Sequence, residues 1–469
     1  MAKRGEGAGA CYNLSGNTDV THELLAARRV GKANFLLVGQ VHGELPYMAG
    51  DAEIGPGELD FALEGVEFTL PAPPRRPIAD ADHAMGVHIA SLIPDGGTLQ
   101  LGIGSLGHAV VQGLILRHKH PSAFRELAEQ LAPGRDHAGR CFEPFQRGLY
   151  AASEMFADAL LELFHAGILK REVDGGVLDA AFFLGPRDFY RARREMPERQ
   201  RQNLRMRSVA FINELYGEDE AARRAQRVNA RFVNNAMIVT ALGAIVSDGL
   251  EDGRVVSGVG GQYNFVAQAF ALQGARSVVA LPATRTSKGK TSSNIKWSYG
   301  HVTIPRHLRD IVVTEYGVAD LRGRSDAETI VQMLAITDSR FQEQLLDAAK
   351  RARKLPKRAT IPAGGQNNDW RRVRGVLADA RRAGRISDFP FGKDYSEAEK
   401  RLFPALGAIR DAAHSKLALA RLALSGLSSA RDLQSQAMLE RLKLASPGTF
   451  SERVSAALVR GGISRSAEP

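Results

Sequence analysis

Short apolar runs alternate with helical stretches over the central part of the chain, and this alternation constrains the fold more than any other feature. Helical stretches such as "AMGVHIASLI" (84–93) and "AVVQGLILRH" (109–118) separate runs rich in Val, Ile, Leu and Ala. These runs occupy residues 95–104, 177–185, 236–248, 277–283 and 310–321. Strands that alternate with helices usually form a parallel sheet with both faces covered. The sequence therefore predicts an α/β fold with a mainly parallel sheet and helices on both faces.

The first glycine-rich strand exit, "LGIGSLG", carries Gly102, Gly104 and Gly107. It follows a strand and precedes a helix, as in the fingerprint of dinucleotide-binding proteins. That fingerprint also needs a second strand ending in an acidic residue about 20 residues further on, but the segment there, "PSAFRELAEQLAPGRD", is helical in pattern. A nucleotide-binding oxidoreductase is therefore a disfavoured alternative. The glycines still indicate a backbone that passes close to a ligand or to a neighbouring helix.

A second glycine-rich strand exit, "SGVGGQYNF" (257–265), carries Gly258, Gly260 and Gly261. Taken alone, such a segment is typical of a tight turn between a strand and a helix. Two of them after two parallel strands indicate a crevice at the carboxyl ends of the strands, where α/β proteins bind ligands. The sequence therefore places a candidate site at that edge of the sheet.

The segment "YAASEMFADALLELFHAGIL" (150–169) places a carboxylate, Glu154, beside a long apolar run. Apolar residues at spacings of three and four predict a helix, with Ser153 as its N-cap and Gly167 as its C-terminal stop. Glu154 would then lie in the first turn, where the helix dipole favours an anion. The local sequence leaves two interpretations open: a charge that stabilises the helix, and a carboxylate with a chemical role.

The chain has a formal charge of +10, which suggests an anionic partner such as nucleic acid, a membrane surface or a phosphorylated cofactor. Beyond residue 350 it is basic, helical and poor in aromatic residues. Base stacking has little support there, so we expect neither nucleic acid nor a membrane as partner, and a nucleic-acid-binding protein remains a lesser alternative. The Arg-rich segment 187–231 predicts solvated helices. "TRTSKGKTSSNIK" (284–296) is suited either to gripping phosphates or to a surface loop.

Cys11 and Cys141 are the two cysteines among 469 residues, and they provide neither a disulfide framework nor a CxxC motif. The N-terminal "MAKRGEGAGACYNLSG" lacks the apolar core of a secretory signal. A run of about 18 apolar residues, which a transmembrane helix needs, does not occur. HExxH, GxSxG and paired histidines at metal spacing are also absent from the sequence. We therefore expect a cytoplasmic protein without a metal site.

Four segments in order resemble the acetyl-CoA hydrolase/transferase family, which includes the 4-hydroxybutyrate CoA-transferases and the succinyl-CoA:acetate CoA-transferases. They are "IPDGGTLQLGIG" (93–104), "SEMFADALLELFHAGIL" (153–169), "SGVGGQYNFVAQA" (257–269) and "VVTEYGVADLRGRS" (312–325). A fifth matching block contains "VVALPAT" and "VTIPRH". The resemblance covers residues 84–345 closely and residues 33–82 more distantly. It implies a CoA-transferase-like fold.

The resemblance implies an enzyme that transfers CoA between an acyl-CoA and a carboxylic acid, or that hydrolyses the acyl-CoA when water replaces the acid. In the family a glutamate attacks the thioester, giving a mixed anhydride and then a glutamyl-CoA thioester, and the matching residue here is Glu154. By the same match, the backbone N–H groups of Ile103 and Gly261 would bind the oxyanion. Asn213 of "FINELYG" and Glu315 of "TEYG" match polar residues of the same pocket.

The family implies no permanently bound cofactor. Coenzyme A or acyl-CoA enters as substrate together with a small carboxylic acid. The negative phosphate groups of CoA would explain the positive charge of the chain. The glycines expected to lie against the CoA substrate are Gly102, Gly104, Gly258, Gly260 and Gly261. A homodimer is left open.

We expect three regions: residues 1–80 as a remnant of an N-terminal CoA-transferase domain with a Pro-rich linker, 81–345 as the catalytic domain, and 346–469 as a basic helical C-terminal extension. Most of the N-terminal domain of relatives is expected to be missing. A catalytically impaired CoA-binding fragment that needs a partner domain is therefore the main alternative. Relatives usually read V-D-F after the second glycine loop, where this chain has Tyr263 and Asn264, and we expect this departure to alter contacts with the substrate.

Overall fold

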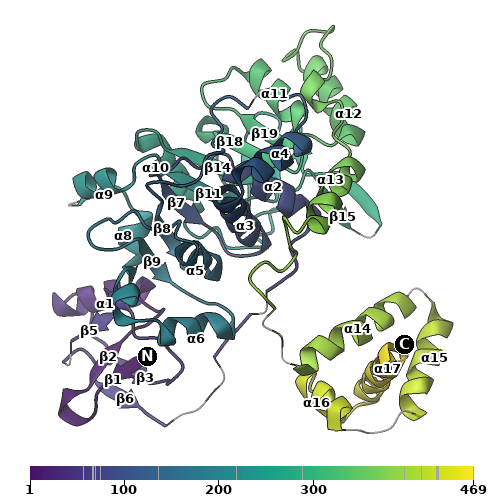
Figure 1. Ribbon diagram of the computed structural model, residues 1–469. Coiled ribbons are helices and arrows are strands. Elements are labelled where there is room, and N and C mark those ends of the chain that lie inside the picture. The colour runs from purple at the N-terminus through teal and green to yellow at the C-terminus, as the bar shows by residue number, and fades with distance from the viewer. Residues whose placement is uncertain are drawn as a thin grey trace. The chain divides into compact units, whose positions relative to one another are not determined.

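A computed structural model describes residues 1–467, with the exception of positions 56, 66, 67, 69, 74, 136, 218, 288, 394, 396, 414 and 429–432. The chain divides into two compact units, Met1–Gly392 and Lys393–Pro469 (Figure 1). All of the described strands and all of the sequence-predicted site residues belong to the first unit.

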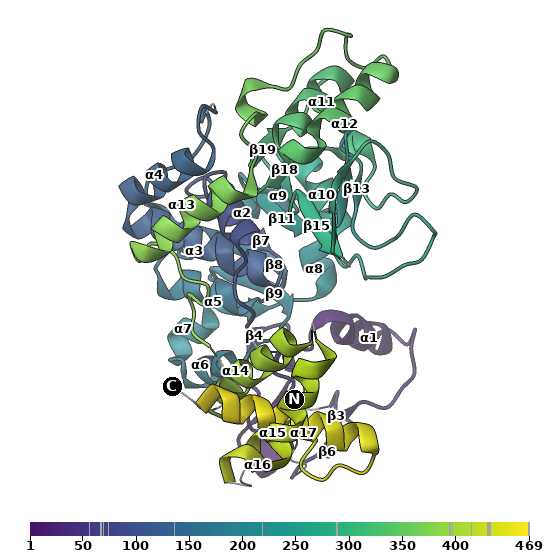
Figure 2. The same ribbon diagram turned by 90° about the vertical axis from the view of Figure 1, so that its right-hand side faces the viewer.

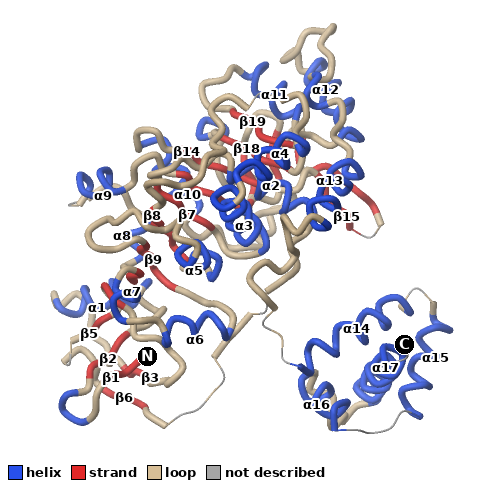
Figure 3. Tube along the Cα trace, in the orientation of Figure 1, coloured by secondary structure: helices blue, strands red, loops and turns tan. Residues whose placement is uncertain are grey.

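A nine-stranded sheet forms the centre of the first unit (Figure 3). In spatial order its strands are β19 (Gly317–Asp320), β18 (Ile311–Thr314), β14 (Arg276–Ala280), β11 (Arg231–Asn235), β7 (Thr98–Leu101), β8 (Tyr150–Met155), β9 (Leu178–Phe182), β10 (Leu204–Met206) and β4 (Ala49–Gly50). Every neighbouring pair is parallel except β18 and β19. The predicted mainly parallel sheet is confirmed.

Alternate residues of the central strands enter different apolar clusters, so both faces of the sheet are covered. In β14, Val278 and Ala280 pack in one cluster and Val279 in another. The first cluster includes side chains from α2 (Asp80–Ala90), α3 (Ser105–Lys119), α4 (Pro121–Leu131), α5 (Asp158–His165) and α13 (Trp370–Arg382). The opposite face is covered by α8 (Val209–Asn213), α10 (Gln262–Ala271), α11 (Asp326–Ala335) and α12 (Ser339–Arg351). Figure 2 shows α2, α3 and α13 on one side of β7 and β8, and α8 and α10 on the other. This alternation follows from the two-residue period of a strand.

Glu154 lies in strand β8, so the prediction that a helix begins at Ser153 is wrong. β8 pairs with β7 on one side and with β9 on the other. Helix α5 begins only at Asp158, while Gly167, with φ 70°, follows its end as predicted. Hydrogen bonding to a neighbouring strand on both edges of β8 has outweighed the local helical spacing of apolar residues. A short apolar run has no strong preference of its own for a helix or a strand. The helix-dipole interpretation of Glu154 therefore no longer applies.

Residues 1–80 belong to the same compact unit as the central sheet. Their elements are β1 (Ala2–Arg4), η1 (Gly7–Gly9), β2 (Cys11–Asn13), α1 (Asp19–Arg29), β3 (Val38–Gln40), β4, β5 (Glu53–Ile54) and β6 (Phe61–Leu63). β1, β2 and β5 form a small antiparallel sheet, and β3 pairs with β6. Arg75 of the Pro-rich stretch lies 2.7 Å from a carboxylate oxygen of Asp158 and 2.6 Å from one of Asp188. This ion-pair network joins the stretch to α5 and to the start of the next helix.

The Arg-rich segment 187–231 is more deeply integrated than the sequence predicted. Its helices are α6 (Arg187–Glu195), α7 (Glu198–Gln202), α8 and α9 (Glu220–Gln226), and it also supplies strand β10 of the central sheet. Arg193 and Arg227 are buried. The predicted helices are present and most of their residues are not buried, whereas strand β10 and the buried arginines were not predicted.

Shorter elements complete the first unit. They are β12 (Ile238–Thr240), β13 (Ile245–Val246), β15 (Thr284–Ser287), β16 (Lys290–Ser293), β17 (Ile295–Lys296), η2 (Arg306–Leu308) and η3 (Ala363–Gly365). The polar stretch 284–296 forms the antiparallel hairpin β15–β16 and then β17, so it is a structured element and not an irregular loop.

The second unit contains the helices α14 (Glu397–Ala412), α15 (Lys416–Ser428), α16 (Leu433–Arg441) and α17 (Phe450–Ala467). It has an apolar cluster of its own, made by Leu402, Met438, Leu439, Ala456 and Val459. The first unit extends to Gly392 and includes α12 and α13, whereas the sequence placed the start of the helical extension at residue 346. Within the described parts of the chain, no helix combines the length and the apolar character needed to cross a bilayer.

Candidate active site

The carboxyl ends of β7 and β8 meet at one edge of the central sheet, where Glu154 stands near the end of β8. In the parallel register Thr98 lies opposite Tyr150, and the Ser153 hydroxyl donates to the carbonyl of Leu101 at 3.0 Å. The glycine-rich loop that follows β7 therefore leaves the sheet beside Glu154. This is the edge at which ligands bind in parallel α/β sheets.

The Glu154 carboxylate is held by two donors on the same oxygen. The backbone N–H of Gly261 donates to Oε2 at 2.7 Å, and the side-chain amide of Asn213 donates to Oε2 at 3.3 Å. No described residue donates a hydrogen bond to Oε1. Glu154 is half-buried. One oxygen is therefore fixed by the protein, while the other keeps its lone pairs available.

Two consecutive glycines allow the second loop to reach Glu154. Gly260 has φ 57°, a conformation that side-chain-bearing residues rarely adopt. Gly261 has an ordinary φ of −80°, but a Cβ on Gly261 would lie 2.1 Å from Glu154 Oε2 and 2.8 Å from Asn213 Nδ2. The glycine at 261 is therefore required by the close approach and not by backbone strain.

Two helices carry the donors, and Gln268 connects them. Gly261 immediately precedes α10, and Asn213 is the last residue of α8. From α10, the amide of Gln268 donates to the carbonyl of Asn213 at 2.8 Å, and Gln268 is 3% exposed. The guanidinium of Arg227 donates to the Gln268 side chain and to the carbonyl of Phe211. These contacts keep both donors in a fixed relation to Glu154.

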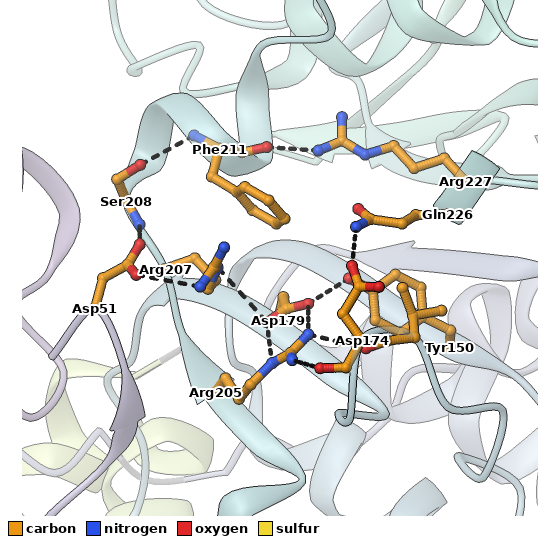
Figure 4. A network of polar contacts seen from close by, with 11 residues as sticks. Asp51, Tyr150, Asp174, Asp179, Arg205, Arg207, Ser208, Phe211, Gln226 and Arg227 are labelled. Atoms are coloured by element: carbon orange, nitrogen blue, oxygen red, sulfur yellow. Dashed lines mark hydrogen bonds and ion pairs between the residues drawn. The ribbon is translucent and has the colours of Figure 1, made fainter. Parts of the chain in front are cut away.

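A network of polar contacts joins β8, β9, β10 and the start of α8 (Figure 4). At its centre is Asp179 of β9, which is fully buried and accepts from Arg205 at 2.8 and 2.7 Å and from the hydroxyl of Tyr150. Burial and the Asp179 carboxylate raise the pKa of Tyr150 well above its usual value. A buried carboxylate paired in this way with Arg and Tyr avoids the cost of an isolated charge. The network therefore fixes β8, β9 and β10 together.

The start of α8 is capped from the same network. The hydroxyl of Ser208 accepts from the backbone N–H of Phe211 at 3.1 Å, and the N–H of Ser208 donates to Asp51 at 3.0 Å (Figure 4). Side-chain caps of this kind satisfy amide groups that the helix itself leaves unpaired. The cap therefore stabilises the short helix that carries Asn213.

Replacing Ser208 with Ala is expected to lower the free energy of unfolding of the first unit by about 1 kcal/mol, because the N-cap acceptor is lost. Urea denaturation of purified variants measures the change. Ser257→Ala is the matched control, since Ser257 is exposed and, among the described residues, its hydroxyl donates a hydrogen bond only to the carbonyl of Gly258. An equal effect of both variants would contradict a capping role for Ser208.

Glu315 lies apart from this cluster. It follows β18, four strand positions from β8 in the sheet, or about 19 Å at ordinary strand spacing. Its carboxylate accepts from the backbone N–H of Ala283 at 2.7 Å, and its side chain is buried. Burial, with smaller contributions from Asp338 and Asp82, raises the pKa of Glu315 to about 7. Among the described residues, no hydrogen bond joins Glu315 to Glu154, Asn213 or Gly261.

The raised pKa of Glu315 predicts a pH dependence of stability. The folded protein holds this proton up to about pH 7, whereas the unfolded chain releases it near pH 4.5. The folded state therefore binds more protons between these values, and its stability falls as the pH rises through them. Glu315→Gln removes this dependence and still accepts from Ala283. From pH 4.5 to 8, the variant should gain about 3 kcal/mol relative to the parent.

Urea denaturation of both proteins at pH 4.5, 6 and 8 checks this expectation. Asp338 and Asp82 are present in both proteins, so their direct titration largely cancels in the difference. Parallel pH profiles for parent and variant would contradict the raised pKa.

The first glycine loop is open toward solvent. Ile103 is 53% exposed, Gly104 has φ 104°, and a Cβ on Gly102 or Gly104 would meet no atom within 4 Å. By contrast, a Cβ on Gly107 would lie 2.6 Å from the carbonyl oxygen of Gly102. Close packing within the turn therefore explains the need for glycine at position 107. It does not explain the glycines at positions 102 and 104. In the second loop, Gly258 is likewise exposed and open, and no described hydrogen bond joins it to Glu154.

The sequence singled out Glu154, Gly261, Gly260 and Asn213, which the structure brings together, and it did not identify Gln268. Gln268 lies on the predicted helical run "NFVAQAFAL" as one polar residue among apolar ones. A buried Gln in such a run is a weak signal on its own, because it does not reveal which carbonyl groups the amide meets.

Comparisons with known proteins agree with the fold and with the motifs. Residues 185–349 match the acetyl-CoA hydrolase/transferase C-terminal domain. The 4-hydroxybutyrate coenzyme A transferase of Clostridium kluyveri is 28% identical over 321 residues, which are 67% of this chain and 65% of that protein. The acetyl-CoA hydrolase of Saccharomyces cerevisiae is 25% identical over 338 residues, 67% of this chain and 55% of the hydrolase. The chain thus spans less than two thirds of the length of either relative.

A solved structure shares the fold. RipA from Yersinia pestis superposes with a TM-score of 0.58 at 23% identity, over 76% of this chain and 70% of RipA. Residues 185–349 thus match the acetyl-CoA hydrolase/transferase C-terminal domain, and relatives named as CoA transferases and acetyl-CoA hydrolases extend the similarity to about two thirds of the chain.

Proposed function

We propose that this chain transfers CoA between an acyl-CoA and a small carboxylic acid, or hydrolyses the acyl-CoA when water takes the place of the acid. The relatives that support this proposal carry the names of CoA transferases and acetyl-CoA hydrolases. The observation that carries it is the geometry of Glu154, whose Oε2 accepts from Gly261 and Asn213 while Oε1 has no described donor. This arrangement suits a carboxylate nucleophile at the ligand-binding edge of the sheet.

In the first step, Oε1 of Glu154 attacks the carbonyl carbon of the acyl-CoA thioester. The carbon–sulfur bond breaks, CoA leaves as the thiolate, and Glu154 becomes a mixed anhydride. The oxyanion of this step forms on the substrate carbonyl, and the backbone N–H of Ile103 in the open first loop is the donor that we propose for it. Gly102 and Gly104 leave room there for the thioester, because neither has a neighbour that a Cβ would meet.

In the second step, the CoA thiolate attacks the side-chain carboxyl carbon of Glu154. The anhydride bond breaks, the free carboxylate departs, and a glutamyl-CoA thioester remains. Here the negative charge develops on the oxygen of Glu154 itself. Gly261 N–H and the Asn213 amide already point at that oxygen, so they would stabilise the intermediate without reorganisation. The acceptor acid then repeats both steps in reverse and leaves as its CoA thioester.

A trapping experiment tests this proposal. The protein is incubated with acetyl-CoA and treated with borohydride, which reduces a glutamyl-CoA thioester to an alcohol. We expect mass spectrometry to find the reduced side chain at Glu154 in the peptide that contains β8. Reduction at Glu315, or turnover with no modified glutamate, would contradict the proposal. Release of free CoA in the absence of an acid would assign hydrolysis, and exchange of CoA onto added propionate would assign transfer.

A second candidate is a protein that binds CoA without turning it over. The departure from the V-D-F segment of relatives favours this candidate. Tyr263 belongs to the segment that departs, lies two residues after Gly261, and is 53% exposed, so it can alter how the substrate lies beside Glu154. Saturable CoA binding together with no exchange would support this alternative. Addition of an N-terminal domain from a relative, in trans or by fusion, should then raise turnover if the chain depends on a partner domain. An unchanged rate of turnover after fusion would show that the chain does not depend on a partner domain.

A further inference from the structure

A cavity of about 290 Å³ lies at the β19 end of the first unit, between α2, the loop after α4, β19 and α11. Its lining includes the basic residues His88, Arg135, His137 and Arg140 and the apolar residues Val318 and Val331. No acidic side chain of the described residues lines it, and position 136 lies outside them. β19 stands five strand positions from β8, or about 24 Å at ordinary strand spacing. The cavity is therefore separate from the site around Glu154.

Arg135 is accommodated by two glycines at the wall of this cavity. A Cβ on Gly317 would lie 3.0 Å from its guanidinium carbon, and one on Gly364 would lie 3.6 Å from its Cγ. The guanidinium donates to the carbonyl of Ala335 at the end of α11. Burial, followed by the charges of Arg372 and Arg140, lowers the pKa of Arg135 to about 10. An anion in the cavity would relieve both the desolvation and the repulsion between like charges.

His88 supplies a second, independent feature. Its side chain is 4% exposed, and its Nε2 is buried without a hydrogen-bond partner among the described residues. Burial, Arg140 and Arg135 lower the pKa of His88 to about 3, so the ring is neutral at pH 7. A buried polar atom without a partner costs free energy, and neutral imidazole can donate or accept there according to its tautomer. A polar group of a bound ligand would satisfy this atom.

We propose that this cavity binds a small organic carboxylate. The carboxylate would contact the guanidinium group of Arg135, whose planar fork matches it. The short apolar part of the ligand would lie against Val318 and Val331. The volume lies at the lower end of the range for small-molecule sites, which suits a ligand of a few carbon atoms. The proposal concerns binding and does not depend on the chemistry assigned to Glu154.

Isothermal titration of the full chain with sodium butyrate at constant ionic strength tests the proposal. Inorganic phosphate serves as an anion without an apolar part. We expect one binding site, with butyrate bound more tightly than phosphate. Arg135→Gln should weaken butyrate binding at least tenfold. Arg231→Gln is the matched control and should retain the affinity, because Arg231 is also half-buried, has its pKa lowered by burial to about 10 and contacts backbone carbonyls, but does not line the cavity.

A steric variant keeps the test valid if the Arg135 variant folds poorly. Val331 lines the cavity and is 37% exposed, so Val331→Trp should fill the cavity, abolish binding and leave the circular dichroism spectrum unchanged. Glu154→Gln should leave butyrate binding intact. If Glu154→Gln abolishes binding and Val331→Trp does not, butyrate occupies the edge near β8, and the proposal is overturned while the proposed function survives. Absence of butyrate binding by the folded parent, or tighter binding of phosphate, would also overturn it.

Discussion

Replacing Glu154 with Gln is expected to lower acyl-CoA turnover by at least about 10³-fold, because an amide is a far weaker nucleophile than a carboxylate. The expected effect on folding is small. The amide oxygen of Gln can still accept from Gly261, so the change replaces a charge-assisted hydrogen bond by a neutral one at a cost of about 1 kcal/mol. Steady-state kinetics with acetyl-CoA and an acceptor acid measure the first effect, and urea denaturation measures the second.

Glu315→Gln is the control for the Glu154 variant. Both positions carry a carboxylate that accepts from a backbone N–H, at Gly261 and Ala283 respectively. If Glu154 is the nucleophile, only its variant should lose the borohydride-reducible thioester. Glu315→Gln should still be modified at Glu154, although its stability follows a different pH profile. A Glu154→Gln protein that turns over acyl-CoA at the parent rate would show that the carboxylate has no chemical role.

The sheet was predictable from the sequence because its strands carry their own signal. Val278 and Val312 lie in short β-branched runs that are buried on both faces, and helical spacing separates these runs along the chain. Such runs favour a parallel sheet whatever their partners are. The first glycine loop follows β7 and was predictable as a strand exit for the same reason. The second was wrongly predicted to follow a parallel strand, because the strand before it, β13, ends at Val246 and belongs to a separate small sheet. The order of the strands is set by long-range pairing and was not accessible from the sequence pattern.

The local structure at Glu154 shows where sequence reasoning fails. The run "YAASEM" contains two alanines and a serine, which do not distinguish a strand from a helix, and the apolar residues after it do form α5. Pairing with β7 and β9 decides the outcome, and both partners are distant in sequence. The resemblance to a family singled out Glu154 as a site candidate, which stays a prediction, whereas the helical geometry first used to explain it was wrong.

The convergence of Asn213 and Gly261 on Glu154 could not be derived from the residues alone. The two donors are 59 and 107 residues away from the carboxylate, so only the topology of α8 and α10 brings them together. Gln268 and the buried Asp179 were missed because a single polar residue in an apolar run looks the same whether it is exposed or paired. Their roles depend on carbonyls and guanidinium groups from other elements.

Replacing Gly261 with Ala is expected to lower acyl-CoA turnover about 10²-fold or more while the protein still folds. The added Cβ would lie 2.1 Å from Glu154 Oε2, so the carboxylate must move. Glu154 ends in a flexible side chain, which makes the movement inexpensive for folding, and φ at Gly261 is −80°, which alanine adopts without strain. The displaced carboxylate loses its bond to the Gly261 N–H, and removal of one such donor typically costs 10²- to 10³-fold in rate.

Gly258→Ala is the control that distinguishes the contact between the added Cβ and Glu154 from a general effect of any substitution in this loop on turnover. A Cβ on Gly258 would meet no atom within 4 Å, so its variant should lose less activity than Gly261→Ala. The double variant with Glu154→Gln gives the sharper test, because groups that act through the same atoms are non-additive. If Gly261 acts by holding Glu154, adding Gly261→Ala to Glu154→Gln should lower the residual rate very little. A full further loss of about 10²-fold would mean that Gly261 acts on the substrate independently of Glu154, and that the second step as proposed is wrong.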